Sequence, residues 1–153
     1  MATIRLHPDF REFLKLLNST RVEYLLIGGY AVGYYGYSRA TMDMDVWIAL
    51  SAGNARKVAD TLIRFGFPEA AVDESAFLDK KRIVRLGLPP VRMEIMTDIS
   101  GVTFDACFKR RNRVVIDGLK INLIALDDLV ANKIASGRHK DLDDVEHLHG
   151  GGG

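Results

Sequence analysis

The chain has 153 residues, of which 48% are hydrophobic and 27% charged, so it has the composition of an ordinary globular protein that can bury a core. Its formal net charge of +1 excludes nucleic-acid binding through overall basic charge, and such binding would need a local patch. Cys107 is the single cysteine, which excludes an intrachain disulfide and favours a reducing cytoplasm. No apolar run resembles a secretion signal or approaches the roughly 20 residues of a membrane helix, so no membrane association is expected.

The length predicts a single minimal domain over residues 1–149. Neither an internal repeat nor a Pro/Ser-rich linker divides the chain. The final four glycines, residues 150–153, are expected to form a flexible tail.

The first half of the chain predicts helices that alternate with buried strands. Pro8 suits a first helical position, and the apolar residues that follow it recur at helical spacing, which indicates a helix over residues 8–18. The elements expected next are a strand at 22–27, a helix at 30–35, a loop at 36–41, a strand at 43–50 and a helix at 51–65.

The second half adds two strand pairs and two closing helices. Strands are expected at 82–88 and 91–96, joined by a tight turn at Pro89-Pro90, with a helical turn at 104–110. Asp117-Gly118 is a hairpin signal between strands at 113–116 and 119–124, and helices follow at 126–136 and 140–148. This mixed order predicts an α+β or mixed α/β fold, with a mixed twisted sheet flanked by helices.

Two aspartates lie on one face of a predicted strand. Side chains alternate faces along a strand, so Asp43 and Asp45 point the same way, while Met44 and Val46 point to the other side. Neighbouring carboxylates repel each other and resist burial, and a divalent cation between them removes both costs. Mg²⁺ prefers oxygen ligands and often shares them with substrate phosphates. The alternative is an exposed strand end with two solvated aspartates.

A third carboxylate lies on another predicted strand. Glu94 points away from the apolar residues of its strand, and beside Asp43 and Asp45 it would complete a site for two metals about 4 Å apart. Alternatively, Glu94 pairs with Arg82, Arg85 or Arg92 on a solvated face. Asp98 competes with Glu94 for the third position.

Gly28-Gly29 lies between a strand and a helix, where backbone N–H groups can approach a phosphate. Arg39 and Thr41 lie in the loop before Asp43. Arg39 is expected to contact phosphate or to pair with the carboxylates, and the alternative is a structural salt bridge.

Lys133 falls on the inward face of its predicted helix, at i+4 from Leu129 and i+3 from Val130. A lysine in that position must meet negative charge, which triphosphate oxygens would supply. The alternative is a buried pair with an aspartate, either Asp43 or Asp141.

Together these segments resemble the polymerase-β-type nucleotidyltransferase superfamily. The resemblance rests on Gly28-Gly29, on the run from Arg39 to Val46 and on a later strand carboxylate, and it covers residues 22–148. The runs 129–133 and 137–144 are similar to a small prokaryotic branch, the abortive-infection (AbiEii-like) toxin nucleotidyltransferases and their relatives.

The resemblance implies a nucleotidyltransferase fold with metal-bound nucleoside triphosphate over the glycine turn. It implies that Asp43, Asp45 and Glu94 ligate Mg²⁺ or Mn²⁺ and are catalytic, and that Gly28, Gly29 and Lys133 face the phosphates. Glu94 departs from the aspartate usual at its position. No appended acceptor-binding domain is visible, so the identity of the acceptor stays open.

The function expected is metal-dependent transfer of NMP from an NTP to an acceptor hydroxyl of RNA, tRNA, protein or a small molecule, with release of pyrophosphate. A role in a toxin–antitoxin pair, with an antitoxin partner or as a homodimer, is part of this expectation. The alternative is a catalytically silent nucleotide- or RNA-binding module that acts with a partner protein.

Overall fold

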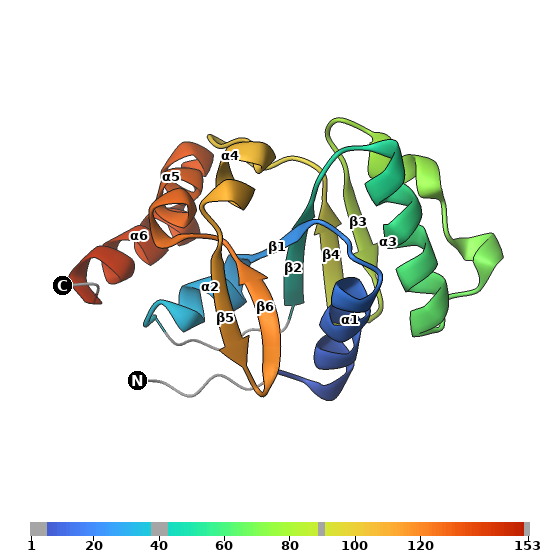
Figure 1. The fold of residues 1–153 in the computed structure, drawn as a ribbon. Coiled ribbons are helices and arrows are strands. Elements are labelled where there is room, and N and C mark those ends of the chain that lie inside the picture. Colours follow the sequence, from blue (N-terminus) through green and yellow to red (C-terminus); the bar gives the residue numbers. More distant parts are fainter. Residues whose placement is uncertain (1–5, 38–42, 89–90, 152–153) are drawn as a thin grey trace.

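A computed structural model describes residues 6–37, 43–88 and 91–151 of the chain. Helices and strands alternate in the first part of these residues, and two strand pairs and two closing helices follow (Figure 1). The helices are α1 (Pro8–Ser19), α2 (Gly28–Tyr34), α3 (Ala52–Phe65), α4 (Phe104–Lys109), α5 (Leu126–Ser136) and α6 (His139–Gly151). The strands are β1 (Tyr24–Ile27), β2 (Asp43–Ile48), β3 (Ile83–Leu86), β4 (Arg92–Met96), β5 (Asn112–Ile116) and β6 (Leu119–Leu123).

The strands of the described residues form a six-stranded mixed sheet in the order β3-β4-β2-β1-β6-β5. β2 is parallel to β4 and β1 is parallel to β6, whereas the other neighbouring pairs are antiparallel. In Figure 1, α3 lies to the right of the sheet, α1 lies in front of the lower ends of β3 and β4, and α5 and α6 lie to the left. The mixed α/β fold expected from the sequence is therefore confirmed.

Apolar side chains at the predicted spacing form the core. The stripe on α1 is buried and consists of Phe10, Phe13, Leu14 and Leu17. The rings of Phe13 and Phe65 meet edge to face at 5.4 Å and join α1 to α3. All four residues of β1 are buried, as a strand between β2 and β6 in the sheet should be.

Most differences from the predicted elements concern their ends. The helix predicted at residues 30–35 begins earlier, at Gly28, directly after β1. Two 3₁₀ helices, Glu69–Ala71 and Glu74–Leu78, had not been expected. The last helix continues past Leu148 to Gly151, into the glycines expected to form a tail. The turn predicted at Pro89-Pro90 lies outside the described residues.

The hairpin predicted at Asp117-Gly118 is confirmed, with φ angles of 53° and 77° at these two residues. Positive φ at both central positions matches the turn that suits the twist of a two-residue hairpin. Within the described residues, every helix is too short or too polar to cross a bilayer.

Candidate active site

The sheet register brings the three predicted carboxylates together. Asp43 and Asp45 occupy alternate positions of β2 and share one face. Glu94 on the parallel strand β4 is the register partner of Asp45, and Arg92 is the partner of Asp43. Because neighbouring strands lie about 4.8 Å apart, Glu94 sits beside Asp45 on the same face of the sheet.

This face opens into a cleft of about 740 Å³. Its lining includes all three carboxylates, the Gly28-Gly29 pair and Lys133. The cleft therefore unites six of the eight residues singled out from the sequence. The other two, Arg39 and Thr41, lie outside the described residues.

Arginines pair with two of the three carboxylates. Arg92 donates to Oδ2 of Asp43 from Nη2 at 2.7 Å and from Nε at 3.2 Å. Arg85 donates from Nε to Oε1 of Glu94 at 3.0 Å. The pairing of Glu94 with an arginine was the alternative considered for this residue, and the partner of Asp43 had not been expected. Both arginines are more exposed than their partners, so water competes for these contacts.

Asp45 has a buried carboxylate oxygen. Within the described residues, its Oδ1 atom is buried and lacks a hydrogen-bond partner. Burial, together with the smaller effects of the Glu94 and Asp43 charges, raises the pKa of Asp45 from 3.8 to about 7, against opposing effects of Lys133 and Lys140. A carboxylate held in this way gains more than its neighbours from a bound cation.

The raised pKa of Asp45 predicts an unusual dependence of stability on pH. Between 3.8 and about 7, the folded chain keeps a proton that the unfolded chain has released, so the free energy of unfolding falls as pH rises. Relative to Asp45→Asn, the wild type should lose on the order of 2–4 kcal/mol across this window. Denaturant titrations of both proteins at pH 5 and pH 8 measure the difference. Parallel stability curves for the two proteins would show that the Asp45 carboxyl group titrates normally.

Gly28 makes room for the Asp45 side chain. Its backbone lies in the left-handed region, at φ +68°. A Cβ atom built on Gly28 would collide with Oδ2 of Asp45, because Ile27, the preceding residue, is the register partner of Asp45. A glycine is therefore required here both by the backbone conformation and by the neighbouring carboxylate.

Gly28→Ala is expected to destabilise the protein by roughly 2–4 kcal/mol and to displace Asp45, since it adds a collision to left-handed strain. Gly137→Ala is the matched control, because Gly137 has φ +66° and nothing within 4 Å of its added Cβ. The melting temperatures of the two variants separate the effect of backbone strain, which both share, from that of the collision with Asp45, which only Gly28→Ala has. Equal losses in the two variants would show that the carboxylate at position 45 does not restrict this glycine.

Lys133 is buried at the edge of the cleft and is held by two aspartates. Its Nζ atom lies 2.9 Å from Oδ1 of Asp141 and 3.2 Å from Oδ2 of Asp144. Burial alone would raise the pKa of Asp141, but hydrogen bonds from Ser136, Lys133 and Arg138 lower it to about 2. The sequence alternative of a buried pair with Asp141 is therefore what the structure shows. An ammonium group has three donors, so two aspartates leave capacity for one more bond.

The structure adds residues that sequence reasoning did not place in the site. Arg85, Arg138 and Lys140 line the cleft as cations, and Lys140 lies close enough to lower the pKa of Asp45. Asp98 also lines the cleft, but it follows the end of β4 and is exposed, so its place differs from that of Glu94. The sequence signal for these cations was the presence of basic residues near an acidic motif. The sequence alone does not show which of these residues face the cleft.

The donor set of the cleft fits a hard divalent cation. Three carboxylates face one cleft, and Asp45 offers a buried oxygen without a hydrogen bond among the described residues. In their present arrangement the three carboxylates are not an assembled metal site, since no three His, Cys, Asp or Glu side chains of the described residues are grouped to hold a metal ion. The arginine partners of Asp43 and Glu94 occupy oxygens that a cation would need.

Comparison with known families agrees with this geometry. Residues 5–149 match the family described as nucleotidyltransferase of unknown function, DUF6036. The chain belongs to this family. The match supports membership of the nucleotidyltransferase superfamily, and the closer relationship to abortive-infection toxins stays a prediction. No curated protein has a significant sequence match to this member of the DUF6036 family.

Solved structures share the fold of this DUF6036 protein at low sequence identity. One is a candidate nucleotidyltransferase from Thermotoga maritima, with 16% identity and a TM-score of 0.62 over 95% of this chain and 96% of that chain. Another is an antigenic nucleotidyltransferase-like protein from Paracoccidioides brasiliensis, with 16% identity and a TM-score of 0.57 over 91% of this chain and 73% of that chain. At this identity the likeness shows the nucleotidyltransferase fold alone.

Proposed function

We propose that this DUF6036 protein transfers a nucleoside monophosphate from a nucleoside triphosphate to an acceptor hydroxyl, with Mg²⁺ or Mn²⁺ as cofactor. The observation that carries the proposal is the register pair of Asp45 and Glu94, which places a third carboxylate beside Asp43 and Asp45 in one cleft. The family match and the shared fold support it.

The proposed cation ligands are Asp43, Asp45 and Glu94. Bound magnesium would neutralise charge on the triphosphate and on the departing pyrophosphate. Asp43 and Glu94 would exchange the hydrogen bonds from Arg92 and Arg85 for this role, which frees two guanidinium groups, and that of Arg85 lines the cleft. Guanidinium groups bind phosphate well, so the same exchange would favour entry of a nucleotide.

In the proposed reaction, the acceptor oxygen forms a bond to the α-phosphorus while the bond from the α-phosphorus to the bridging oxygen breaks. Glu94 would accept the proton of the acceptor hydroxyl at a carboxylate oxygen. Lys133 would donate to the triphosphate through the N–H that its two aspartates do not use. Gly28 and Gly29 line the cleft without side chains and would let the phosphates approach the backbone.

The test is a transfer assay with each α-labelled NTP, Mg²⁺ or Mn²⁺, and cell RNA or lysate protein as the source of acceptors. Label should pass to an acceptor with the wild type and fail to do so with Asp43→Asn. Nucleotide binding without transfer under every condition would favour the alternative of a silent binding module. Activity that persists in Asp43→Asn would remove this residue from the site.

Membership of a toxin–antitoxin pair stays a prediction for this chain. Growth arrest on expression of the wild type, relieved by Asp45→Asn, would support it. Normal growth with an active enzyme would argue for another role of the same chemistry.

A further inference from the structure

A second concave surface lies on the β5–β6 hairpin, and we call it the basic groove. It has a volume of about 680 Å³, and its lining comes from the end of α1, the link between α1 and β1, the end of α4 and the residue Arg111 that follows it, and β5 and β6. Val114 and Ile121 of the hairpin are buried against the core, whereas Arg113 and Lys120 are exposed. The exposed cations of the hairpin therefore lie on its solvent-facing side, and the groove also reaches Val114 and Ile121.

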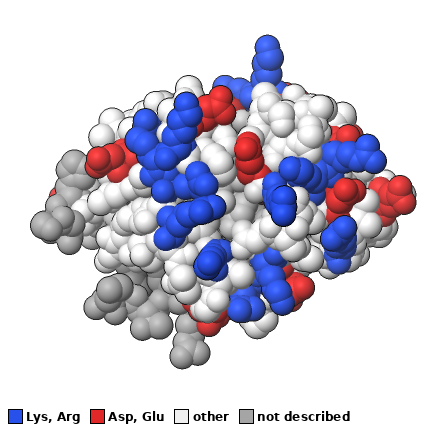
Figure 2. All heavy atoms as spheres, in the orientation of Figure 1, with Lys and Arg blue, Asp and Glu red and all other residues white. Residues whose placement is uncertain are grey.

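The charge of the basic groove is strongly one-sided. Its lining contains four cations, Arg21, Arg111, Arg113 and Lys120, and one acid, Glu23. In the described part of the chain, the ion pairs involve other residues, so none of these four cations forms a direct ion pair with a carboxylate there. Figure 2 shows lysine and arginine side chains gathered in a band over α4 and the hairpin. Since the net charge of the chain is only +1, this concentration is local.

A flat, ordered platform adjoins these charges. The guanidinium carbon of Arg111 lies 4.0 Å from the centre of the Phe108 ring. Arg111 is held in place by donating to the carbonyl of Phe108 at 2.8 Å and to Oδ1 of Asn122 at 3.3 Å. Val115 adds an apolar side chain that is 65% exposed. A stacked arginine beside exposed apolar surface is the kind of surface on which nucleic-acid bases stack.

The backbone at Arg21 gives an independent reason to assign function to the groove. Arg21 ends α1 in the left-handed conformation, at φ 61°. Val22 N donates to Leu17 O and Arg21 N donates to Asn18 O, which is the bonding pattern of a glycine-terminated helix. Positive-φ glycines, Gly66 and Gly137, follow α3 and α5. The left-handed backbone costs an arginine more than a glycine, and a use for the arginine side chain would account for that cost.

We propose that the basic groove binds single-stranded RNA, with phosphates at Arg21, Arg113 and Lys120 and a base on the Arg111 platform. A concave surface that alternates cations with flat groups suits a sugar–phosphate chain, whereas membrane binding favours a protruding apolar face. Binding itself is independent of the proposed transfer reaction. Only the choice of RNA over DNA rests on that function, because RNA offers an acceptor hydroxyl on each ribose.

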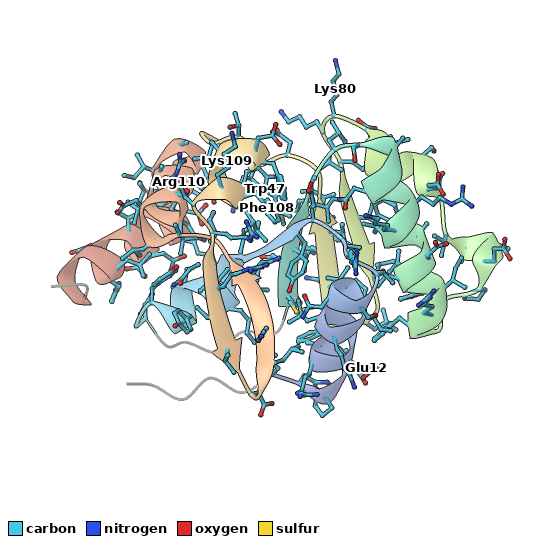
Figure 3. The ribbon with its side chains drawn as sticks, viewed as in Figure 1. Glu12, Trp47, Lys80, Phe108, Lys109 and Arg110 are labelled. Atoms are coloured by element: carbon cyan, nitrogen blue, oxygen red, sulfur yellow. The ribbon has the colours of Figure 1, made fainter. Side chains whose placement is uncertain are left out.

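Aromatic side chains separate the groove from the cleft. Trp47 shares a face of β2 with the site aspartates and meets Phe104 edge to face at 5.1 Å. Phe104 in turn stacks on Phe108, which lines the groove, at 5.3 Å. Figure 3 shows Trp47 and Phe108 near each other at α4. Variants in the groove should therefore leave the carboxylates undisturbed.

The sharpest test is Arg21→Gly, which removes the side chain and relieves the backbone. The melting temperature should rise by about 2–4 °C. Affinity for a labelled, unstructured RNA of about 12 nucleotides, measured by fluorescence anisotropy, should fall about fivefold. A more stable protein that binds RNA less tightly is not expected of a merely structural residue.

A charge variant and two controls complete the test. Arg113→Gln combined with Lys120→Gln should weaken binding at least about tenfold and lower the slope of log affinity against log salt concentration by about 0.7 for each phosphate that no longer meets a cation. Lys80→Gln, at the remote position labelled in Figure 3, should bind like the wild type. Asp45→Asn should also bind like the wild type, so a failure of transfer and a failure of binding are distinguishable.

Several results would overturn the proposal. These are absence of RNA binding by the wild type at low salt, unchanged binding by the groove variants, and tighter binding of DNA of the same sequence. Binding of phosphatidylserine vesicles that disappears in the groove variants while RNA binding is kept would assign the groove to a membrane instead.

Discussion

Replacing Asp45 with asparagine should lower the rate of nucleotidyl transfer by roughly 10³-fold or more while leaving the fold intact. Asparagine keeps the size of the side chain but removes the charge that a cation needs. Because the pKa of Asp45 is raised to about 7 by burial and by the charges of Glu94 and Asp43, the variant should also be more stable at pH 8. A loss of activity together with a gain of stability would show that the Asp45 carboxylate serves the reaction and lowers the stability of the fold.

The measurement pairs a transfer assay with denaturant unfolding of the same preparations. Asp98→Asn is the control, since this exposed carboxylate lines the same cleft without a register position beside Asp45. It should retain most of the activity. Comparable losses of activity in Asp98→Asn and Asp45→Asn would indicate that Asp98, rather than Glu94, is the third metal ligand.

Lys133→Met should have the largest effect on stability, a loss of about 3–5 kcal/mol. The variant keeps a long side chain but leaves Asp141 and Asp144 buried without their shared ammonium group. The side chains of these aspartates are only 2% and 0% exposed, so water cannot replace the missing partner. Removing one member of a buried charge cluster costs far more than the cluster contributes in total.

Arg138→Met is the matched control for this prediction. Arg138 also donates to Asp141, at 2.7 Å, but its own side chain is 76% exposed. An exposed partner is screened by water, so its loss should cost less than about 1 kcal/mol. Urea titrations of both variants give the two values. Similar costs would show that the lysine cluster is hydrated and does not hold α5 to α6.

Local patterns predicted much of the fold. The spacing of Phe10, Phe13 and Leu17 fixes the buried face of α1, and the alternation in β2 separates its buried residues from its aspartates. The Asp117-Gly118 pair predicts a two-residue turn, and both residues have positive φ. These features depend on neighbours in sequence, so they can be recognised without knowing the tertiary structure.

Features that depend on pairing between distant segments were not predictable in the same way. The parallel alignment of β2 with β4 decides that Glu94 faces Asp45, and the sequence left Glu94 and Asp98 as alternatives. The ion-pair partners of the site residues also depend on contacts between distant segments. Asp144 meets Lys133, and Arg92 meets Asp43, only because separate elements pack together. The helix start at Gly28 was missed because a glycine pair normally indicates a turn.

The most direct test of the account is calorimetric titration of Mn²⁺ into the protein with a non-transferable ATP analogue present. The wild type should bind the cation, and Asp43→Asn, Asp45→Asn and Glu94→Gln should each weaken binding by at least about tenfold. Equal affinity in all four proteins, or no binding by the wild type, would mean that the cleft at the β2–β4 junction is not a metal–nucleotide site.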